Sequence, residues 1–262
     1  MKPYIFGKRN TIHIIDIRET VKGLLRAKRF IAKVVSSGED VIFVGTKRQA
    51  RIQIKEHATR VGMPWVTDRW LGGTLTNFRT IRSRLARLEE LEAAEADGSS
   101  QQYSKKMIAK RTREQRKILR NLQGIREMDR LPGAVIIVDV HRERNAVLEA
   151  RKLGIPTICL IDTDSDPDFA DIPIPGNDDA IRAIDTILKH LANAIEEGLR
   201  GRKAPPEEAG DDPKPTPPRE AVEAAGSVAP VTQTEITGTD AGASSEPKPS
   251  DNAGVTAATA SD

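Results

Sequence analysis

Apolar and polar positions alternate in two distinct patterns along residues 1–203. Short runs of β-branched and other apolar residues at 41–44, 134–138 and 157–161 are typical of strands that are covered on both faces. Between these runs, apolar residues recur every three or four positions, as in amphipathic helices, and glycines such as Gly154 follow the last apolar turn. Strands that alternate with helices over short connections predict an α/β fold with a parallel sheet flanked by helices.

Polar residues predict where these helices begin. Asp16 and Glu19 have the spacing of a capping box. Thr46 and Gln49 have the same spacing, and Asn177 is a typical N-cap residue ahead of the last apolar helix. The apolar face of the first long helix is expected to consist of Val21, Leu24, Leu25, Ile31, Val34 and Val35.

Residues 77–130 interrupt this alternation. Asn77 is a candidate N-cap for a helix with a narrow apolar stripe, a polar turn at 97–100 follows, and a second long helix carries another narrow stripe. Two such stripes around a turn predict an antiparallel helical hairpin of coiled-coil type, inserted into a sheet domain that comprises 1–76 and 131–203. The two predicted stripes are Ile81, Leu85, Leu88 and Leu91 in the first helix and Met107, Ile108, Ile118, Leu119 and Leu122 in the second.

The segment 204–262 differs in composition from the rest of the chain. It holds nine prolines and no aromatic residue, so it cannot bury enough apolar surface to offset the entropy of ordering, and we expect it to be disordered. Its eleven acidic and three basic residues leave a formal charge of +11 on residues 1–203 of a chain whose total is +3. A body this basic attracts polyanions, and we expect the acidic tail to weaken their nonspecific binding by competing for the same surface.

Composition excludes several classes of protein. The single cysteine, Cys159, cannot form an internal disulfide or a cysteine-based zinc site, and it indicates a reducing compartment. No apolar stretch approaches the roughly 20 residues of a membrane helix, and the N-terminus lacks the apolar segment of a signal peptide. We therefore expect a cytoplasmic protein with no membrane partner.

The second helix of the predicted hairpin is strongly basic. Its cations are scarcely balanced, because Glu114 is the single acid among them. Helix pairs that merely carry solvated charge mostly alternate the two signs, so this excess favours contact with phosphates over a plain solvated face. The basic residues are Lys105, Lys106, Lys110, Arg111, Arg113, Arg116, Lys117 and Arg120.

A second candidate site is the turn at 44–49, between a predicted strand and the N-terminus of a helix, where backbone N–H groups favour anions. Its single glycine, Gly45, does not match the phosphate-binding loops of nucleotide enzymes, which need several glycines at fixed spacing. Lys47 and Arg48 at a helix start are unfavourable for the helix dipole. We therefore expect both side chains to contact the phosphate backbone of RNA rather than a free nucleotide.

Residues 68–79 combine aromatic rings and polar side chains around a Gly-Gly turn, in a chain with only 3% aromatic residues. Such groups can stack on bases and pair with phosphates. For Trp70, base stacking and packing of the hairpin onto the sheet both remain open, whereas Phe78 is expected in the core. The polar residues of this segment that we expect to contact RNA are Arg69, Asn77 and Arg79.

Acidic residues follow two of the predicted strands, with Asp139 after one and a cluster at 162–168 after the next. Carboxylates at the carboxyl edge of a parallel sheet can hold magnesium and support phosphoryl chemistry. A magnesium-dependent phosphatase or a nucleotide-binding regulator that uses Asp139 and Asp162 is therefore the rival hypothesis. Against it, no serine, cysteine or lysine stands beside a base as an evident nucleophile, and the cluster also matches a polar loop of Asx turns.

Several motifs in a fixed order carry a resemblance to a known family. The sequence resembles the bacterial small-subunit ribosomal protein S2 family, and the likeness extends from about residue 3 to about residue 200. The motifs include Pro3-Tyr4-Ile5-Phe6-Gly7, Phe43-Val44-Gly45-Thr46-Lys47, Arg69-Trp70-Leu71-Gly72-Gly73-Thr74-Leu75-Thr76-Asn77, Asp162-Thr163-Asp164-Ser165-Asp166-Pro167 and Ile174-Pro175-Gly176-Asn177. Family members ordinarily carry a further helix ahead of Lys2-Pro3-Tyr4, the region with which this sequence begins.

The resemblance implies a flavodoxin-like parallel sheet with an inserted helical hairpin, no catalytic activity and no cofactor or metal. It implies docking on the small subunit through ribosomal RNA, contacts with other small-subunit proteins, and a role in recruiting the large mRNA-binding ribosomal protein S1; no homo-oligomer is expected. The residues expected to contact RNA are Lys8, Arg9, Lys47, Arg48, Arg69, Trp70, Asn77, Arg79, Lys105, Lys106, Arg111 and Arg113.

Overall fold

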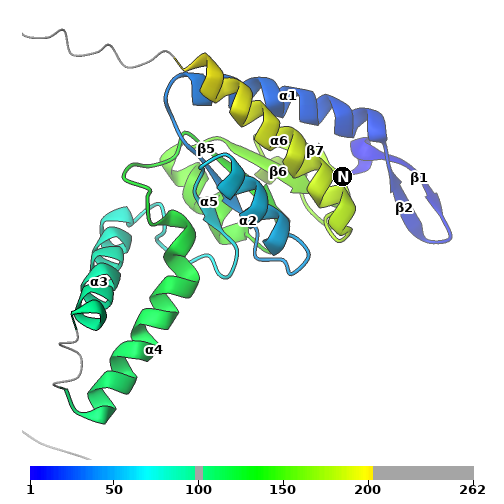
Figure 1. Ribbon diagram of the computed structural model, residues 1–262. Coiled ribbons are helices and arrows are strands. Elements are labelled where there is room, and N and C mark those ends of the chain that lie inside the picture. Colours follow the sequence, from blue (N-terminus) through cyan, green and yellow to red (C-terminus); the bar gives the residue numbers. More distant parts are fainter. Residues whose placement is uncertain (98–102, 203–262) are drawn as a thin grey trace, which may run out of the picture. The chain divides into compact units, whose positions relative to one another are not determined.

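A computed structural model of the protein describes residues 1–97 and 103–202. The predicted turn beyond Asp97 and the predicted disordered tail at 204–262 lie outside these residues. The helices and strands are β1 (Ile5–Arg9), β2 (Ile12–Ile15), α1 (Ile17–Ser36), β3 (Val41–Val44), α2 (Arg51–Arg60), β4 (Trp65–Val66), α3 (Phe78–Ala96), α4 (Lys105–Leu122), β5 (Ala134–Val138), α5 (Arg144–Leu153), β6 (Thr157–Ile161), β7 (Ile172–Pro175) and α6 (Ile181–Gly201) (Figure 1).

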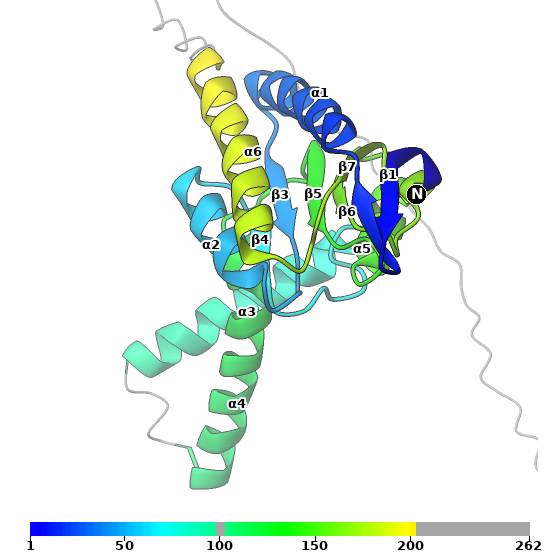
Figure 2. The same ribbon diagram turned by 90° about the vertical axis from the view of Figure 1, so that its right-hand side faces the viewer.

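Five parallel strands form the central sheet, in the order β4-β3-β5-β6-β7. Counted along the chain, this is the 2-1-3-4-5 order of flavodoxin-like folds. Helices α1, α2 and α6 cover one face of the sheet (Figure 2), whereas α5 and the base of the α3–α4 hairpin cover the other. The predicted fold class is confirmed.

The buried runs of the sequence are continuous because both faces of the sheet are covered. In β3, the side chains of Val41 and Phe43 pack under α1, α2 and α6. The side chains of Ile42 and Val44 pack under α5 and the hairpin base. None of the four residues has exposed surface. The strand therefore lacks the alternation of apolar and polar residues that is typical of a strand with one face in water.

The first apolar stretch of the chain is not part of the parallel sheet. Strand β2 pairs antiparallel with β1, with Lys8 opposite His13 and Arg9 opposite Ile12. Asn10 and Thr11 connect the two strands with positive φ values of 47° and 66°, the backbone of a two-residue hairpin turn.

Two helix starts differ from the predictions, because Thr46 bonds to a tertiary partner and Asn177 closes a local turn ahead of its helix. Asp16 is the N-cap of α1 and accepts a hydrogen bond from the backbone N–H of Arg18, 2.9 Å away, as a cap should. Thr46, in contrast, caps nothing: α2 begins at Arg51, and the Thr46 hydroxyl bonds to Glu143. Asn177 lies ahead of α6, which begins at Ile181, and its side chain closes an Asx turn instead.

The apolar faces of two helices also differ from the predicted stripes. In α1 the buried face contains Gly23 and Ala27, whereas the predicted core residues Val21 and Leu25 are 47% and 49% exposed. A Cβ at Gly23 would lie 2.5 Å from the carbonyl oxygen of Pro173, so the small residues let the helix approach β7 closely.

The hairpin stripe is confirmed for α3, where Ile81, Leu85, Leu88 and Leu91 are buried. In α4, Ile118 and Leu122 are buried, but Met107 is 45% exposed. The division of the chain into a sheet domain, a hairpin at 77–130 and a tail stays a prediction. None of the helices in 1–97 and 103–202 combines the length and apolar composition of a membrane span.

Candidate nucleic-acid interface

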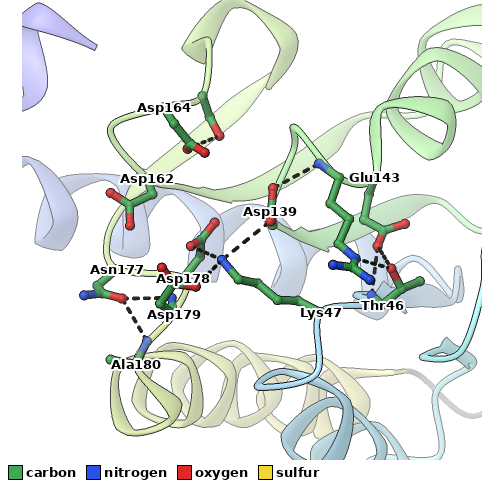
Figure 3. Close-up of polar contacts among 12 residues, drawn as sticks. Thr46, Lys47, Asp139, Glu143, Asp162, Asp164, Asn177, Asp178, Asp179 and Ala180 are labelled. Carbon is green, nitrogen blue, oxygen red and sulfur yellow. Dashed lines mark hydrogen bonds and ion pairs between the residues drawn. The ribbon is translucent and has the colours of Figure 1, made fainter.

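The carboxyl edge of the sheet is the place where open α/β folds bind ligands, in the crevice where the strand order reverses. Here that crevice, between the loops that follow β3 and β5, is occupied by the side chain of Lys47. Its ammonium nitrogen lies 2.5 Å from Asp178 Oδ1, 2.6 Å from Asp179 Oδ1 and 3.6 Å from Asp139 Oδ2 (Figure 3). The Lys47 side chain is 15% exposed. These ion pairs favour an internal role for Lys47, and its expected contact with RNA stays a prediction.

An excess of carboxylates around one ammonium group determines the pKa values in this cluster. Burial, with smaller contributions from the nearby charges of Asp139 and Asp162, raises the pKa of Asp178 to about 6, although the hydrogen bond and the charge of the Lys47 ammonium act in the opposite direction. Burial lowers the pKa of Lys47, but its hydrogen bonds to Asp178 and Asp179 outweigh that effect and raise it overall. The Asp178 shift thus comes mainly from burial, whereas the Lys47 shift comes from its carboxylate partners.

A hydrogen-bonded network closes the other side of the crevice. Glu143 Oε1 accepts from the Thr46 backbone N–H at 2.8 Å and from the Thr46 hydroxyl at 2.5 Å (Figure 3). The Nε–H of Arg142 donates to the same hydroxyl oxygen at 2.9 Å. Glu143 is 3% exposed, and burial raises the pKa of its carboxyl. Thr46 and Lys47 of the candidate anion loop thus make internal contacts, whereas Arg48 of the same loop is exposed.

The acids of the rival hypothesis do not form an enzyme-like centre. Asp139 is paired with Lys47 and accepts a hydrogen bond from the Arg142 backbone N–H, 3.0 Å away. Carboxylate oxygens of Asp162, Asp178 and Asp179 lie within 4.8 Å of one another, but Asp178 and Asp179 already bind the Lys47 ammonium. A catalytic arrangement would need a nucleophile or base free to act, and these groups hold one another.

The segment at 68–79 is organised by Glu149 of α5, a residue that sequence reasoning missed. Its Oε1 accepts from the Trp70 indole N–H at 3.1 Å and the Gly73 backbone N–H at 2.8 Å. Its Oε2 accepts from the backbone N–H groups of Leu75 and Thr76, at 3.1 and 3.2 Å, and from the Thr76 hydroxyl at 3.2 Å. Burial raises the pKa of Glu149, but these hydrogen bonds outweigh it and lower the pKa overall.

The position of Trp70 favours one of its two alternatives. Trp70 is 7% exposed and packs in the core beneath α5 and the hairpin base. A residue with so little exposed surface offers a base little area on which to stack, so the geometry favours packing over stacking. Phe78 packs against the same core, as expected. No sequence spacing pointed to Glu149, which lies more than 70 positions away from the loop it holds.

The remaining predicted contacts lie at the surface. Asn77 is exposed, and its side-chain oxygen accepts from the Thr80 hydroxyl. Arg111 stacks on the Tyr103 ring, with its guanidinium carbon 3.9 Å from the ring centroid. The other predicted contacts are exposed cations with no ion-pair partner among the described residues, namely Lys8 and Arg9 on β1, Arg48 ahead of α2, Arg69 after β4, Arg79 on α3, and Lys105, Lys106 and Arg113 on α4.

Comparison with known proteins identifies the family to which these features belong. The family model for "Ribosomal protein S2" matches residues 1–198. The chain belongs to the ribosomal protein S2 family. Two relatives named "Small ribosomal subunit protein uS2" illustrate the similarity. The protein of Rhodopirellula baltica is 60% identical over 195 residues, which cover 74% of this chain and 75% of the relative. That of Syntrophobacter fumaroxidans is 53% identical over 200 residues, covering 76% and 73%.

Membership of the ribosomal protein S2 family assigns the chain to the small ribosomal subunit and to translation. The family is a structural component of the ribosome and not an enzyme, so the phosphatase hypothesis is set aside. The filled crevice at the carboxyl edge of the sheet is consistent with that role, because the position of a flavodoxin-like ligand is taken by Lys47 and its carboxylate partners.

Proposed function

We propose that this protein binds ribosomal RNA through the cations of α4 and the adjoining loops, and that it acts from the cytoplasm, where small subunits work. The observation that carries the proposal is the unbalanced charge of α4. Within the described residues, none of Lys105, Lys106, Lys110, Arg113, Arg116 and Lys117 has an ion-pair partner.

The acids of the hairpin that have partners among the described residues contact groups outside this set. Glu114, the single acid of α4, lies 4.0 Å from Arg87 of α3. Glu92 pairs at 2.8 Å with Arg126, which follows α4. Glu95 accepts a hydrogen bond from Gln115. The cations of α4 therefore keep their charge available for an external partner, and phosphates are the partners that such clusters select.

The spacing of these cations adds geometry to the charge argument. Lys106, Lys110, Arg113 and Lys117 follow one another at three or four positions, so they lie along one face of the helix. Continued to Arg120, the stripe is about 21 Å long. A row of this length can follow the backbone of a folded RNA over several phosphates.

The test compares RNA binding of two triple variants across a range of salt concentrations. Lys106→Gln, Lys110→Gln and Arg113→Gln together should make the log–log salt slope for small-subunit RNA shallower by about 2–3, at roughly 0.7–0.9 per phosphate contact. Arg26→Gln, Arg29→Gln and Lys33→Gln on α1 remove the same charge from exposed positions. Equal slopes for the two triples, or no salt-dependent binding by the wild type, would refute the proposal.

The role in recruiting ribosomal protein S1, implied by the resemblance, completes the proposed function. An apolar hollow of about 730 Å³ between β2 and α6 supports it, because exposed apolar surface of this kind marks protein-binding sites. Ile12 and Ile17 line the hollow and are 70% and 75% exposed. Ile12→Asp should lower co-sedimentation of S1 with reconstituted small subunits. Ile52→Asp, at a 72% exposed position of α2, is the control and should not lower it. An equal effect of the two substitutions would count against the proposed role of the hollow in recruiting S1.

A further inference from the structure

A polar cleft of about 670 Å³ opens between the C-terminal half of α4 and the carboxyl edge of the sheet. Its volume falls within the roughly 300–1,000 Å³ of ligand pockets. Five cations line it, from three separate parts of the chain: Arg69, Arg116, Lys117, Arg120 and Arg142. The acids at the cleft are Asp68 and Glu143, so the lining carries a surplus of positive charge.

The two acids leave most of these cations free. Glu143 already accepts two hydrogen bonds from Thr46 and is buried. The terminal nitrogens of Arg142 have no hydrogen-bond partner among the described residues, since only its Nε–H is engaged, by Thr46. Arg69, Arg116 and Lys117 likewise have no carboxylate partner in the described part of the chain. Guanidinium groups in this state suit the paired oxygens of a phosphate.

Asp68 at the cleft holds two guanidinium groups that an anion could otherwise bind. Its Oδ1 lies 3.2 Å from Arg120 Nε and 3.4 Å from Arg51 Nη1, so one carboxylate oxygen bridges two guanidinium groups. The Arg120 side chain is 69% exposed, and an exposed ion pair contributes little stability. The pair can therefore open when a stronger anion arrives, while in its absence Asp68 keeps Arg120 directed toward the cleft.

We propose that this cleft binds a backbone phosphate of folded RNA, and that the phosphate replaces Asp68 as the ion-pair partner of Arg120. The inference rests on the proposed function and adds to it a specific pocket and an internal competitor. The cleft continues into a second hollow along α4, with which it shares Lys117 and Asn121. A charged path of this kind suits a polynucleotide strand rather than a small phosphate ester held at one point.

Two substitutions with opposite expected effects test the proposal in RNA-binding titrations. Asp68→Asn removes the competitor and should tighten binding of small-subunit RNA by about two- to fivefold, the range that corresponds to an exposed ion pair of up to about 1 kcal/mol. Arg120→Gln should weaken binding and make the salt slope shallower by about 0.7–0.9. Glu197→Gln and Arg29→Gln, at exposed positions of α6 and α1, are the matched controls for a general change of charge.

The outcomes separate this inference from the proposed function. If the wild type binds RNA with a steep salt slope but the two cleft variants match their controls, the cleft proposal is wrong and the proposed function stands. If the wild type does not bind, both fail. Calorimetric titration with inorganic phosphate alone is the second arm: saturable phosphate binding that Arg120→Gln abolishes would assign the cleft to a free phosphate and overturn the RNA assignment.

Discussion

The contact between Glu149 and the loop at 70–76 makes a quantitative prediction, because one carboxylate accepts five hydrogen bonds there. Glu149→Gln keeps the shape of the side chain but turns one acceptor oxygen into an NH2 group. On the Oε1 side that change opposes the Trp70 indole and Gly73 N–H donors, and on the Oε2 side it opposes those of Leu75 and Thr76. At least two donors lose their acceptor in either orientation.

The cost follows from the number of donors left unpaired. Hydrogen bonds to charged groups contribute about 1.5–3 kcal/mol each, but Glu149 is partly exposed, and water can replace some of what is lost. We therefore use about 1 kcal/mol for each of two donors, or about 2 kcal/mol in the free energy of unfolding. For a domain of this size that corresponds to a fall in Tm of about 4–8 °C.

Thermal unfolding followed by circular dichroism measures this difference, with Glu197→Gln at an exposed position of α6 as the control. The folded-state pKa of Glu149 is lowered from its ordinary 4.5, so its stabilisation is present above pH 4.5 and is lost as the pH falls through the folded-state value. The gap between wild type and variant should close in acid. A variant as stable as the control at pH 7, or a gap that does not change on acidification, would refute the reasoning.

Two further predictions concern the crevice and the base of the hairpin. Lys47→Met leaves the buried carboxylates of Asp139 and Asp178 without a cation and should cost about 3 kcal/mol in the free energy of unfolding at pH 7. Loss of the ammonium raises the pKa of Asp178 above its wild-type value of about 6, so the deficit should shrink as the pH falls toward 6 and Asp178 is protonated in the variant first. The salt slope of this variant for RNA should equal that of the wild type, and a shallower slope would identify Lys47 as an RNA contact. Gly124→Ala puts a Cβ against the backbone and ring of Trp65 and should lower the free energy of unfolding, measured in urea, by about 1–3 kcal/mol. Gly7→Ala, where nothing lies within 4 Å of the added Cβ, is the control and should not lower it. Equal urea midpoints for the two variants would contradict the close approach of Gly124 to Trp65.

The pattern of buried runs predicted the sheet, because a parallel strand covered on both faces must be apolar throughout. The buried stripe of α3 was also predicted, because apolar residues three or four positions apart, such as Leu85 and Leu88, lie on the same face of a helix. The stripe of α1 was predicted less well. Gly23 and Ala27 are not strongly hydrophobic, and only the approach of the helix to β7 makes them core residues while leaving Val21 and Leu25 exposed.

The candidate contacts divide along the same line. Net charge and composition identified α4 as the basic element. Residues that are near in sequence are also near in space on a helix, so a basic segment with few acids in its sequence has few acids close to its cations. Charge pattern could not show that Lys47 has partners in Asp139 and Asp178, more than 90 positions away. It could not show that Glu149 bonds to the loop of Trp70 either, since the sequence around these residues does not determine where α5 packs.

Local chemistry alone therefore determined the fold class, the basic character of α4 and the family likeness, all of which depend on residues that are neighbours along the chain. Tertiary structure alone decided which cations remain free. An ion pair depends on the distance between two charges in space, and for Lys47 and Arg120 that distance is set by the packing of segments that the sequence holds far apart.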